Sequence, residues 1–255
     1  MPGSLKTEAV VLRSLRYGEA DRILHLYTPE LGRVGAIAKG VRRARSRFGG
    51  RLEPCTRVAL VLHRGRGDLM TVTGADTIAP HRRLREHAGA LDAAVRACDA
   101  VNRLFGDGEP HPPAYHLLCN ELALLDRDPG AATWANQLAF RLKLLVAAGL
   151  APQLGSCTAC GEAEHLVGFS GAAGGVVCSA CEAGSFPLSE EAHAFMTGAL
   201  GAPLAEAPDA EPRALRQAER AIAETAEHHA GVRLRAAVGD AAARVGSAHR
   251  AATMG

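Results

Sequence analysis

Residues 38–55 read AKGVRRARSRFGGRLEPC and separate three predicted strands from two more. The stretch holds a single acid, Glu53, and the following cations: Lys39, Arg42, Arg43, Arg45, Arg47 and Arg51. Because cations at this density repel one another, a folded protein keeps them together chiefly where a polyanion binds. The stretch therefore predicts a nucleic-acid-binding loop, and a solvated basic loop without a partner is the alternative.

Short apolar segments rich in β-branched residues flank the basic stretch on both sides. Three precede it and two follow it, at residues 8–15, 22–28, 33–39, 56–63 and 68–75. Turn residues such as Pro29 and Gly32 separate them. Five strands within about 70 residues, with the longest connection between the third and the fourth, predict a closed β-barrel of oligonucleotide-binding (OB) type. An SH3-like barrel is the alternative.

Charge is distributed unevenly along the 255 residues, although the formal net charge is only +2. Residues 1–80 contain 14 Lys and Arg against 7 Asp and Glu, whereas the rest of the chain contains 15 against 20. The amino-terminal third therefore carries the predicted anion-binding surface. Its aromatic residues are only Tyr17, Tyr27 and Phe48. We therefore expect binding through phosphates more than through base stacking, with steep salt dependence and little sequence preference.

Four of the seven cysteines form two CxxC pairs, Cys157 with Cys160 and Cys178 with Cys181. Each CxxC turn presents two thiolates on one side, so two such turns complete a tetrahedron around a metal ion. A closed set of four thiolates leaves no open coordination position for catalysis. The spacing predicts one structural Zn²⁺ in a zinc-ribbon-like module.

Beyond the predicted barrel, apolar residues recur with helical spacing in residues 84–105, 114–125 and 131–149. Residues 188–249 are also predicted to be helical, with an acidic, Pro-rich linker at 203–212 and no bulky apolar periodicity from about residue 236. The sequence thus predicts an α+β protein of several domains. We expect an OB-type nucleic-acid-binding domain at 1–80, a helical domain at 81–155 and 185–255, and the four-cysteine module inserted between them at 156–184. No apolar run reaches 18 residues and no signal peptide is recognisable, so we expect a cytoplasmic protein without a membrane span.

No phosphate-binding glycine loop, zinc-protease helix or nucleophile elbow occurs in the chain. Strand annealing needs no covalent step, only charge neutralisation that lets two polyanions approach. We therefore expect a binding protein and no catalytic residues. A nucleic-acid-processing enzyme whose site these motifs do not reveal is the alternative.

The amino-terminal part resembles the RecO family of bacterial recombination mediators. The resemblance lies in residues 11–12, 17–22, 28–32, 38–40, 42–43, 46 and 52–54, and it continues more loosely to about residue 240. It implies an OB domain followed by a helical domain. It also implies binding of ssDNA and dsDNA, annealing of complementary strands, and cooperation with RecR to load RecA onto DNA coated by single-stranded DNA-binding protein (SSB), with nucleoid association during repair.

On this hypothesis basic side chains of the barrel contact phosphates. We expect these contacts from Lys6, Arg13, Arg33, Lys39, Arg42, Arg43, Arg45, Arg47 and Arg51. The resemblance further implies that the acidic, apolar-ended tail of SSB docks on the helical domain, and Arg141 and Lys143 beside Leu142 and Leu145 are the candidate contacts. An OB and zinc-ribbon protein that binds RNA in translation or ribosome assembly is the alternative function.

Overall fold

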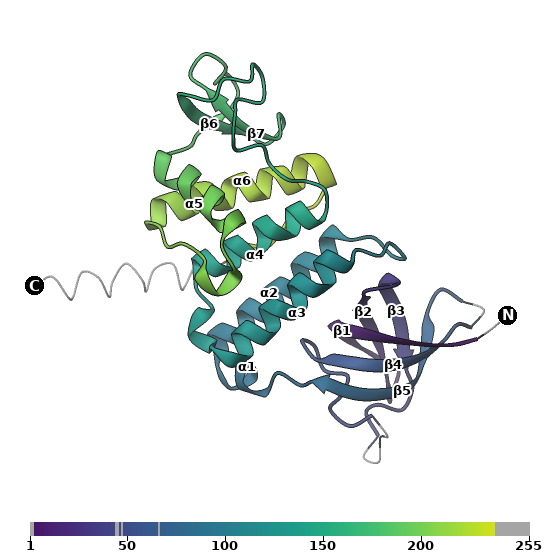
Figure 1. The fold of residues 1–255 in the computed structure, drawn as a ribbon. Coiled ribbons are helices and arrows are strands. Elements are labelled where there is room, and N and C mark those ends of the chain that lie inside the picture. Colours follow the sequence, from purple (N-terminus) through teal and green to yellow (C-terminus); the bar gives the residue numbers. More distant parts are fainter. Residues whose placement is uncertain (1–2, 44–45, 47, 66, 238–255) are drawn as a thin grey trace, which may run out of the picture.

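The computed structural model describes residues 3–43, 46, 48–65 and 67–237, and begins with a closed five-stranded barrel (Figure 1). Its strands are β1 (Ser4–Tyr17), β2 (Asp21–Thr28), β3 (Gly32–Ala38), β4 (Arg57–His63) and β5 (Met70–Ala79). They lie in the order β1-β2-β3-β5-β4, and only β3 and β5 pair in parallel. The predicted OB-type barrel is confirmed.

Strand β1 closes the barrel because its two halves pair with different neighbours. Residues 4–10 pair with β4 and residues 10–17 pair with β2. A β-bulge between Val11 and Arg13 marks the change, and the backbone of Val11 bonds there to Cys55 and Thr56 at 2.8 and 3.0 Å. A bulge bends a strand and increases its twist, which lets one strand serve two sheet edges. The sequence predicted only residues 8–15 of this strand, because its exposed first residues, 4–6, lack apolar alternation.

Along the chain, some of the helices that follow the barrel precede the four-cysteine module and the others come after it. They are α1 (Arg82–Glu86), α2 (Ala88–Leu104), α3 (Pro112–Arg127), η1 (Pro129–Ala131), α4 (Trp134–Ala147), α5 (Glu190–Gly201), η2 (Leu204–Glu206) and α6 (Pro212–Ala230). The first predicted helix is broken at His87, whose backbone is extended. Among these helices none is long and apolar enough to cross a membrane.

The barrel packs against α2 and α3 through side chains that point out of its wall. Tyr27 lies with its ring centroid 5.5 Å from that of Phe105 and 6.5 Å from that of Tyr115. Val10 and Leu12 of β1 belong to the same buried cluster. Barrel and helices therefore share one continuous apolar contact, in addition to the barrel's own interior core.

The four-cysteine module lies at the opposite end of the molecule from the barrel, with the helices between them (Figure 1). Its sheet consists of β6 (Leu166–Ser170), β7 (Gly175–Cys178) and β8 (Phe186–Pro187), in the order β7-β6-β8. Phe169, Val176 and Phe186 of this sheet are buried in one cluster with α4, α5 and α6. The module is thus attached to the helices by apolar packing as well as by the chain.

One buried carboxyl group makes the stability of the helical part depend on pH. Glu121 of α3 is 1% exposed and accepts a 3.5 Å hydrogen bond from Nδ2 of Asn136. Burial raises the pKa of Glu121 to about 8. Between roughly pH 4.3 and 8 the folded state keeps this proton and the unfolded state releases it, so the free energy of unfolding falls as the pH rises.

Glu121→Gln removes this titration and keeps a carbonyl oxygen that accepts from Asn136. In the unmodified chain the free energy of unfolding should fall between pH 5.5 and pH 8.0. In Glu121→Gln this fall should be smaller by on the order of 2 kcal/mol, as measured by urea denaturation at both pH values. Glu206→Gln, at an exposed position, is the matched control. An equal pH dependence in both variants would show that Glu121 does not titrate in this range.

Candidate nucleic-acid interface and candidate metal centre

The basic loop, residues 39–56, joins β3 to β4 and is fixed to the barrel where it begins. The amide of Gly40 donates to Oδ1 of Asp21 at 2.8 Å, and the amide of Arg42 donates to the carbonyl of Ala20 at 2.9 Å. Gly40 has φ +68°, a left-handed conformation that glycine adopts without steric cost. The turn before β2 thus sets the direction in which the loop leaves the barrel.

The second half of the basic loop is anchored by apolar side chains. Phe48 and Leu52 are each 1% exposed and belong to the barrel core. Next to them Glu53 pairs with the guanidinium of Arg22, at 3.1 Å. The only acid of the loop is therefore neutralised by a strand residue, and it does not cancel the charge of the loop arginines.

Four of the predicted phosphate contacts are exposed side chains of the basic loop in the structure: Lys39, Arg42, Arg43 and Arg51. Arg51 also donates to the carbonyl of Phe48 at 3.2 Å, which holds it over the loop. Arg45 and Arg47 lie outside the residues that the structure describes. The described part of the loop is therefore a cationic surface on an anchored backbone.

The three outlying cations lie apart from the basic loop. Arg33 on β3 pairs with Asp107 at 2.7 Å, at the contact between barrel and helices. Arg13 lines a small pocket of about 140 Å³ with Asp99 of α2. Lys6 is exposed on the first half of β1. Of the three, only Lys6 and Arg13 present exposed side chains.

Aromatic side chains contribute little to the outer face of the barrel. Tyr27 and Phe48 are buried in the two cores, whereas Tyr17 is 52% exposed at the end of β1. Burial raises the pKa of Tyr27 well above its ordinary value, so its hydroxyl stays neutral. The described outer surface of the barrel therefore presents exposed cations and few exposed aromatic rings.

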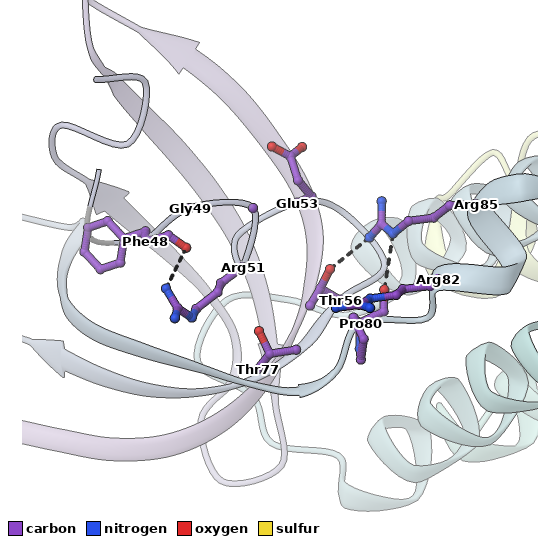
Figure 2. Close-up of a pocket in the computed structure, with 10 residues that line it drawn as sticks. Phe48, Gly49, Arg51, Glu53, Thr56, Thr77, Pro80, Arg82 and Arg85 are labelled. Carbon is purple, nitrogen blue, oxygen red and sulfur yellow. Dashed lines mark hydrogen bonds between the residues drawn. The ribbon is translucent and has the colours of Figure 1, made fainter. Parts of the chain in front are cut away.

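The sequence analysis missed a second group of cations, on α1. Arg82 and Arg85 line a pocket of about 580 Å³ together with Arg51 of the basic loop (Figure 2). The signal was present in the sequence, since residues 81–86 read HRRLRE directly after the last strand. Nothing local to that segment, however, indicates that it folds back beside the loop.

The four cysteines of the CxxC pairs form a compact cluster. Their sulfur atoms all lie within 4.8 Å of one another, which would allow them to bind one metal ion. Cys157 and Cys178 are buried and Cys160 is exposed. Hydrogen bonding by the backbone of Cys178 lowers the pKa of Cys157 to about 6, whereas hydrogen bonding by the side chain of Cys160 raises the pKa of Cys181.

The backbone around the cluster is arranged as two tight turns. The amide of Gly161 donates to the carbonyl of Cys157 at 2.9 Å, and the amide of Cys181 donates to that of Cys178 at 3.0 Å. Gly161 follows the first pair with φ +80°, a value that most other residues avoid. The predicted grouping of the four thiols is confirmed.

The remaining cysteines lie near the barrel. Cys55 and Cys98 are buried with their sulfur atoms 3.8 Å apart, and Cys119 is partly buried. Burial raises the pKa of Cys119, which disfavours its thiolate.

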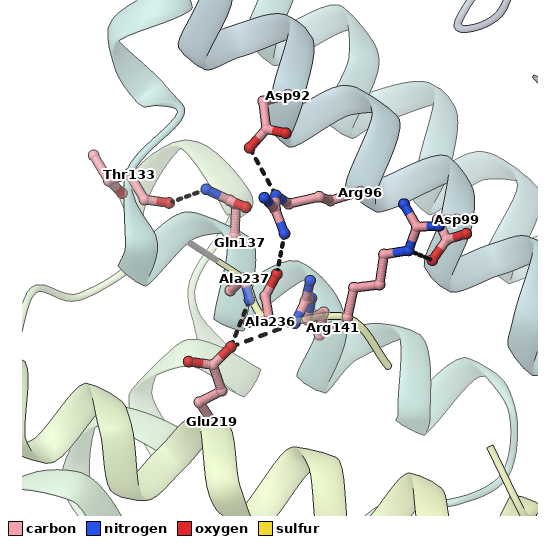
Figure 3. A network of polar contacts seen from close by, with 10 residues as sticks. Asp92, Arg96, Asp99, Thr133, Gln137, Arg141, Glu219, Ala236 and Ala237 are labelled. Atoms are coloured by element: carbon pink, nitrogen blue, oxygen red, sulfur yellow. Dashed lines mark hydrogen bonds and ion pairs between the residues drawn. The ribbon is translucent and has the colours of Figure 1, made fainter. Parts of the chain in front are cut away.

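Arg141 and Lys143 of α4 point in different directions. Arg141 is 4% exposed and pairs with Glu219 of α6 at 3.6 Å, inside a polar network that reaches Ala237 (Figure 3). Burial lowers the pKa of Arg141 to about 10. Lys143 instead donates to the carbonyl of Leu200 at 2.8 Å. The two cations line two separate pockets of about 410 Å³ each.

The chain matches two family models in succession. Residues 1–81 match "Recombination protein O N terminal", and residues 86–237 match "Recombination protein O C terminal". Together they cover the barrel, the helices and the four-cysteine module.

Curated relatives match over most of their length. The DNA repair protein RecO of Rubrobacter xylanophilus is 39% identical over 223 residues, which cover 85% of this chain and 88% of that protein. The DNA repair protein RecO of Anaeromyxobacter sp. strain K is 38% identical over 242 residues, 91% of this chain and 94% of that protein. With the OB-type barrel and the clustered cysteines on the same chain, these matches show that the chain belongs to the RecO family of DNA repair proteins.

Proposed function

We propose that this DNA repair protein is a non-enzymatic recombination mediator that binds ssDNA and dsDNA and anneals complementary strands. Together with RecR, it helps to load RecA onto ssDNA coated by SSB. The observation that carries the proposal is the set of exposed cations on the anchored basic loop of an OB-type barrel. Loops between the strands of such barrels are where oligonucleotides bind.

Charge neutralisation is the physical basis of the proposed annealing. Two strands repel each other through their phosphates, and arginines that replace the condensed counterions lower this repulsion. Guanidinium groups suit the task, because their planar donors bind two phosphate oxygens at once. With two of the three barrel aromatics buried, the bases stay free to pair with a second strand.

We propose that the parts of the chain divide these tasks. Residues 1–80 bind DNA, residues 81–155 and 185–255 form the helical domain that contacts partner proteins, and residues 156–184 hold Zn²⁺. Residues 238–255 of that helical domain lie outside the part that the structure describes. We assign Zn²⁺ to this site because four thiolates in a tetrahedral arrangement are its typical structural ligands.

For the acidic tail of SSB, the pocket beside Lys143 fits better than the one beside Arg141. It is lined by Lys143 and Arg127, with Leu117 and Leu124 supplying apolar surface. Arg127 is exposed, whereas Arg141 is buried and already paired with Glu219. An acidic peptide with an apolar end needs accessible cations beside an apolar floor.

The basic loop is tested by annealing of two labelled complementary strands over a salt series. The variant Arg42/Arg43/Arg45/Arg47→Ala should lose annealing, and the slope of log affinity for ssDNA against log salt should flatten by up to about 3. Arg213/Arg216/Arg233/Arg235→Ala removes the same charge from exposed positions of the carboxy-terminal part and is the matched control. Equal annealing by both variants would place the DNA elsewhere, and a preference for RNA would favour the RNA-binding alternative.

The metal site is tested by Cys157→Ser/Cys178→Ser. We expect one equivalent of zinc in the unmodified protein and almost none in this variant, measured by elemental analysis. The midpoint of thermal unfolding should fall by at least about 5 °C, since metal binding and folding of the module are coupled. Cys119→Ser, outside the cluster, should keep its zinc. Full zinc content in the double variant would contradict the site.

The SSB pocket is tested with a fluorescent peptide of the SSB carboxy-terminal tail. Lys143→Glu should abolish peptide binding, because it places a like charge beside the acidic side chains. Arg216→Glu, in the pocket of Arg141, makes the same charge change on the other side of α4. Loss of binding in Arg216→Glu with full binding in Lys143→Glu would assign the tail to the other pocket.

A further inference from the structure

The junction pocket lies where the basic loop meets the end of β5 and the start of α1 (Figure 2). Its volume is about 580 Å³. The polar side chains that line it come from three separate segments of the chain: Arg51, Glu53, Thr56, Thr77, Arg82 and Arg85. It therefore exists only because α1 follows the barrel closely and lies beside the basic loop.

Positive charge dominates the junction pocket. Three guanidinium groups line it, from Arg51, Arg82 and Arg85, against the single carboxylate of Glu53. That carboxylate pairs with Arg22, a fourth guanidinium, at 3.1 Å. The lining thus holds more guanidinium groups than carboxylates, which favours an anionic ligand.

The arginines of α1 have different roles. Arg85 is held in place, since it donates to the carbonyl of Pro80 at 3.2 Å and to Oγ1 of Thr56 at 2.8 Å. It thereby fixes α1 to the base of the loop. Arg82 is exposed, and among residues 3–43, 46, 48–65 and 67–237 none forms a hydrogen bond or ion pair with its side chain. Its five N–H donors are available to a ligand.

The lining of the junction pocket suits a sugar–phosphate backbone better than a base. Its one aromatic residue, Phe48, is 1% exposed and offers no ring for stacking. Thr77, exposed at the end of β5, adds a hydroxyl to the guanidinium donors. Arginine and hydroxyl donors of this kind make the phosphate contacts that position a strand without reading its sequence.

We propose that the junction pocket binds backbone phosphate of the DNA strand that lies on the basic loop, with Arg82 as the contact contributed by the helical part. This inference rests on the proposed function. Arg51 lines the pocket and belongs to the loop, so the two surfaces are continuous. The bound DNA strand then extends past the barrel onto the first residues of the helical part. Arg85 acts as a positioning residue.

The experiment measures ssDNA affinity over a salt series for Arg82→Ala, Arg82→Lys and the control Arg213→Ala. Arg82→Ala should bind on the order of three- to tenfold more weakly at low salt, with the slope of log affinity against log salt flattened by about 0.7. Arg82→Lys keeps the charge and should restore the slope. Arg213 is an exposed arginine on α6, and its replacement should leave affinity and slope unchanged.

Two failures are distinguishable in this experiment. If Arg82→Ala matches Arg213→Ala while Arg42/Arg43/Arg45/Arg47→Ala loses binding, the junction pocket is not part of the DNA path and the proposed function stands. If the loop variant also keeps full binding, the proposed function fails as well. Circular dichroism and zinc content confirm folding, and weakened binding in Arg82→Lys equal to that in Arg82→Ala would overturn a role based on charge.

Discussion

The burial of Phe48 and Leu52 in the barrel is the contact on which the candidate interface depends. A run of arginines has no tendency to order itself, because its charges repel one another. Two apolar side chains buried from the same loop each contribute about 1.5–3 kcal/mol, which offsets that repulsion and fixes the backbone between them and β4. The Arg22–Glu53 pair lies next to this anchor, and Arg85 of α1 donates to Oγ1 of Thr56 at the end of the same loop. Loop, junction pocket and barrel end are therefore one structural unit.

The sequence predicted the features that depend on local pattern. Alternation of apolar residues revealed the strands, because neighbouring residues determine it. The spacing of the CxxC pairs revealed the cysteine cluster, because two such pairs supply the four thiolates of one tetrahedral site. Contacts between distant segments could not be predicted in this way. The meeting of Arg82 with the basic loop depends on how α1 leaves the barrel, and the break at His87 has no proline or glycine at that residue to signal it.

The placement of Arg141 and Lys143 has a simpler explanation in helix geometry. Residues two apart on an α-helix point about 200° away from each other, so side chains at these positions face different neighbours. Arg141 meets α6, whereas Lys143 reaches the end of α5. Two residues that are close in the sequence, such as these, therefore need not belong to one binding surface. The leucines beside them, Leu142 and Leu145, are fully buried and belong to the packing of the helices.

The apolar face that Tyr27 contributes to the outside of the barrel wall has a consequence for synthesis of the chain on the ribosome. All five barrel strands have been made once residue 79 is added, yet the helices that cover Tyr27, Val10 and Leu12 end only at residue 127. At roughly 5–20 residues per second, the nascent barrel presents this aromatic and aliphatic face for about 2–10 s before α2 and α3 arrive. During that interval the face is a binding site for chaperones and a point of risk for aggregation.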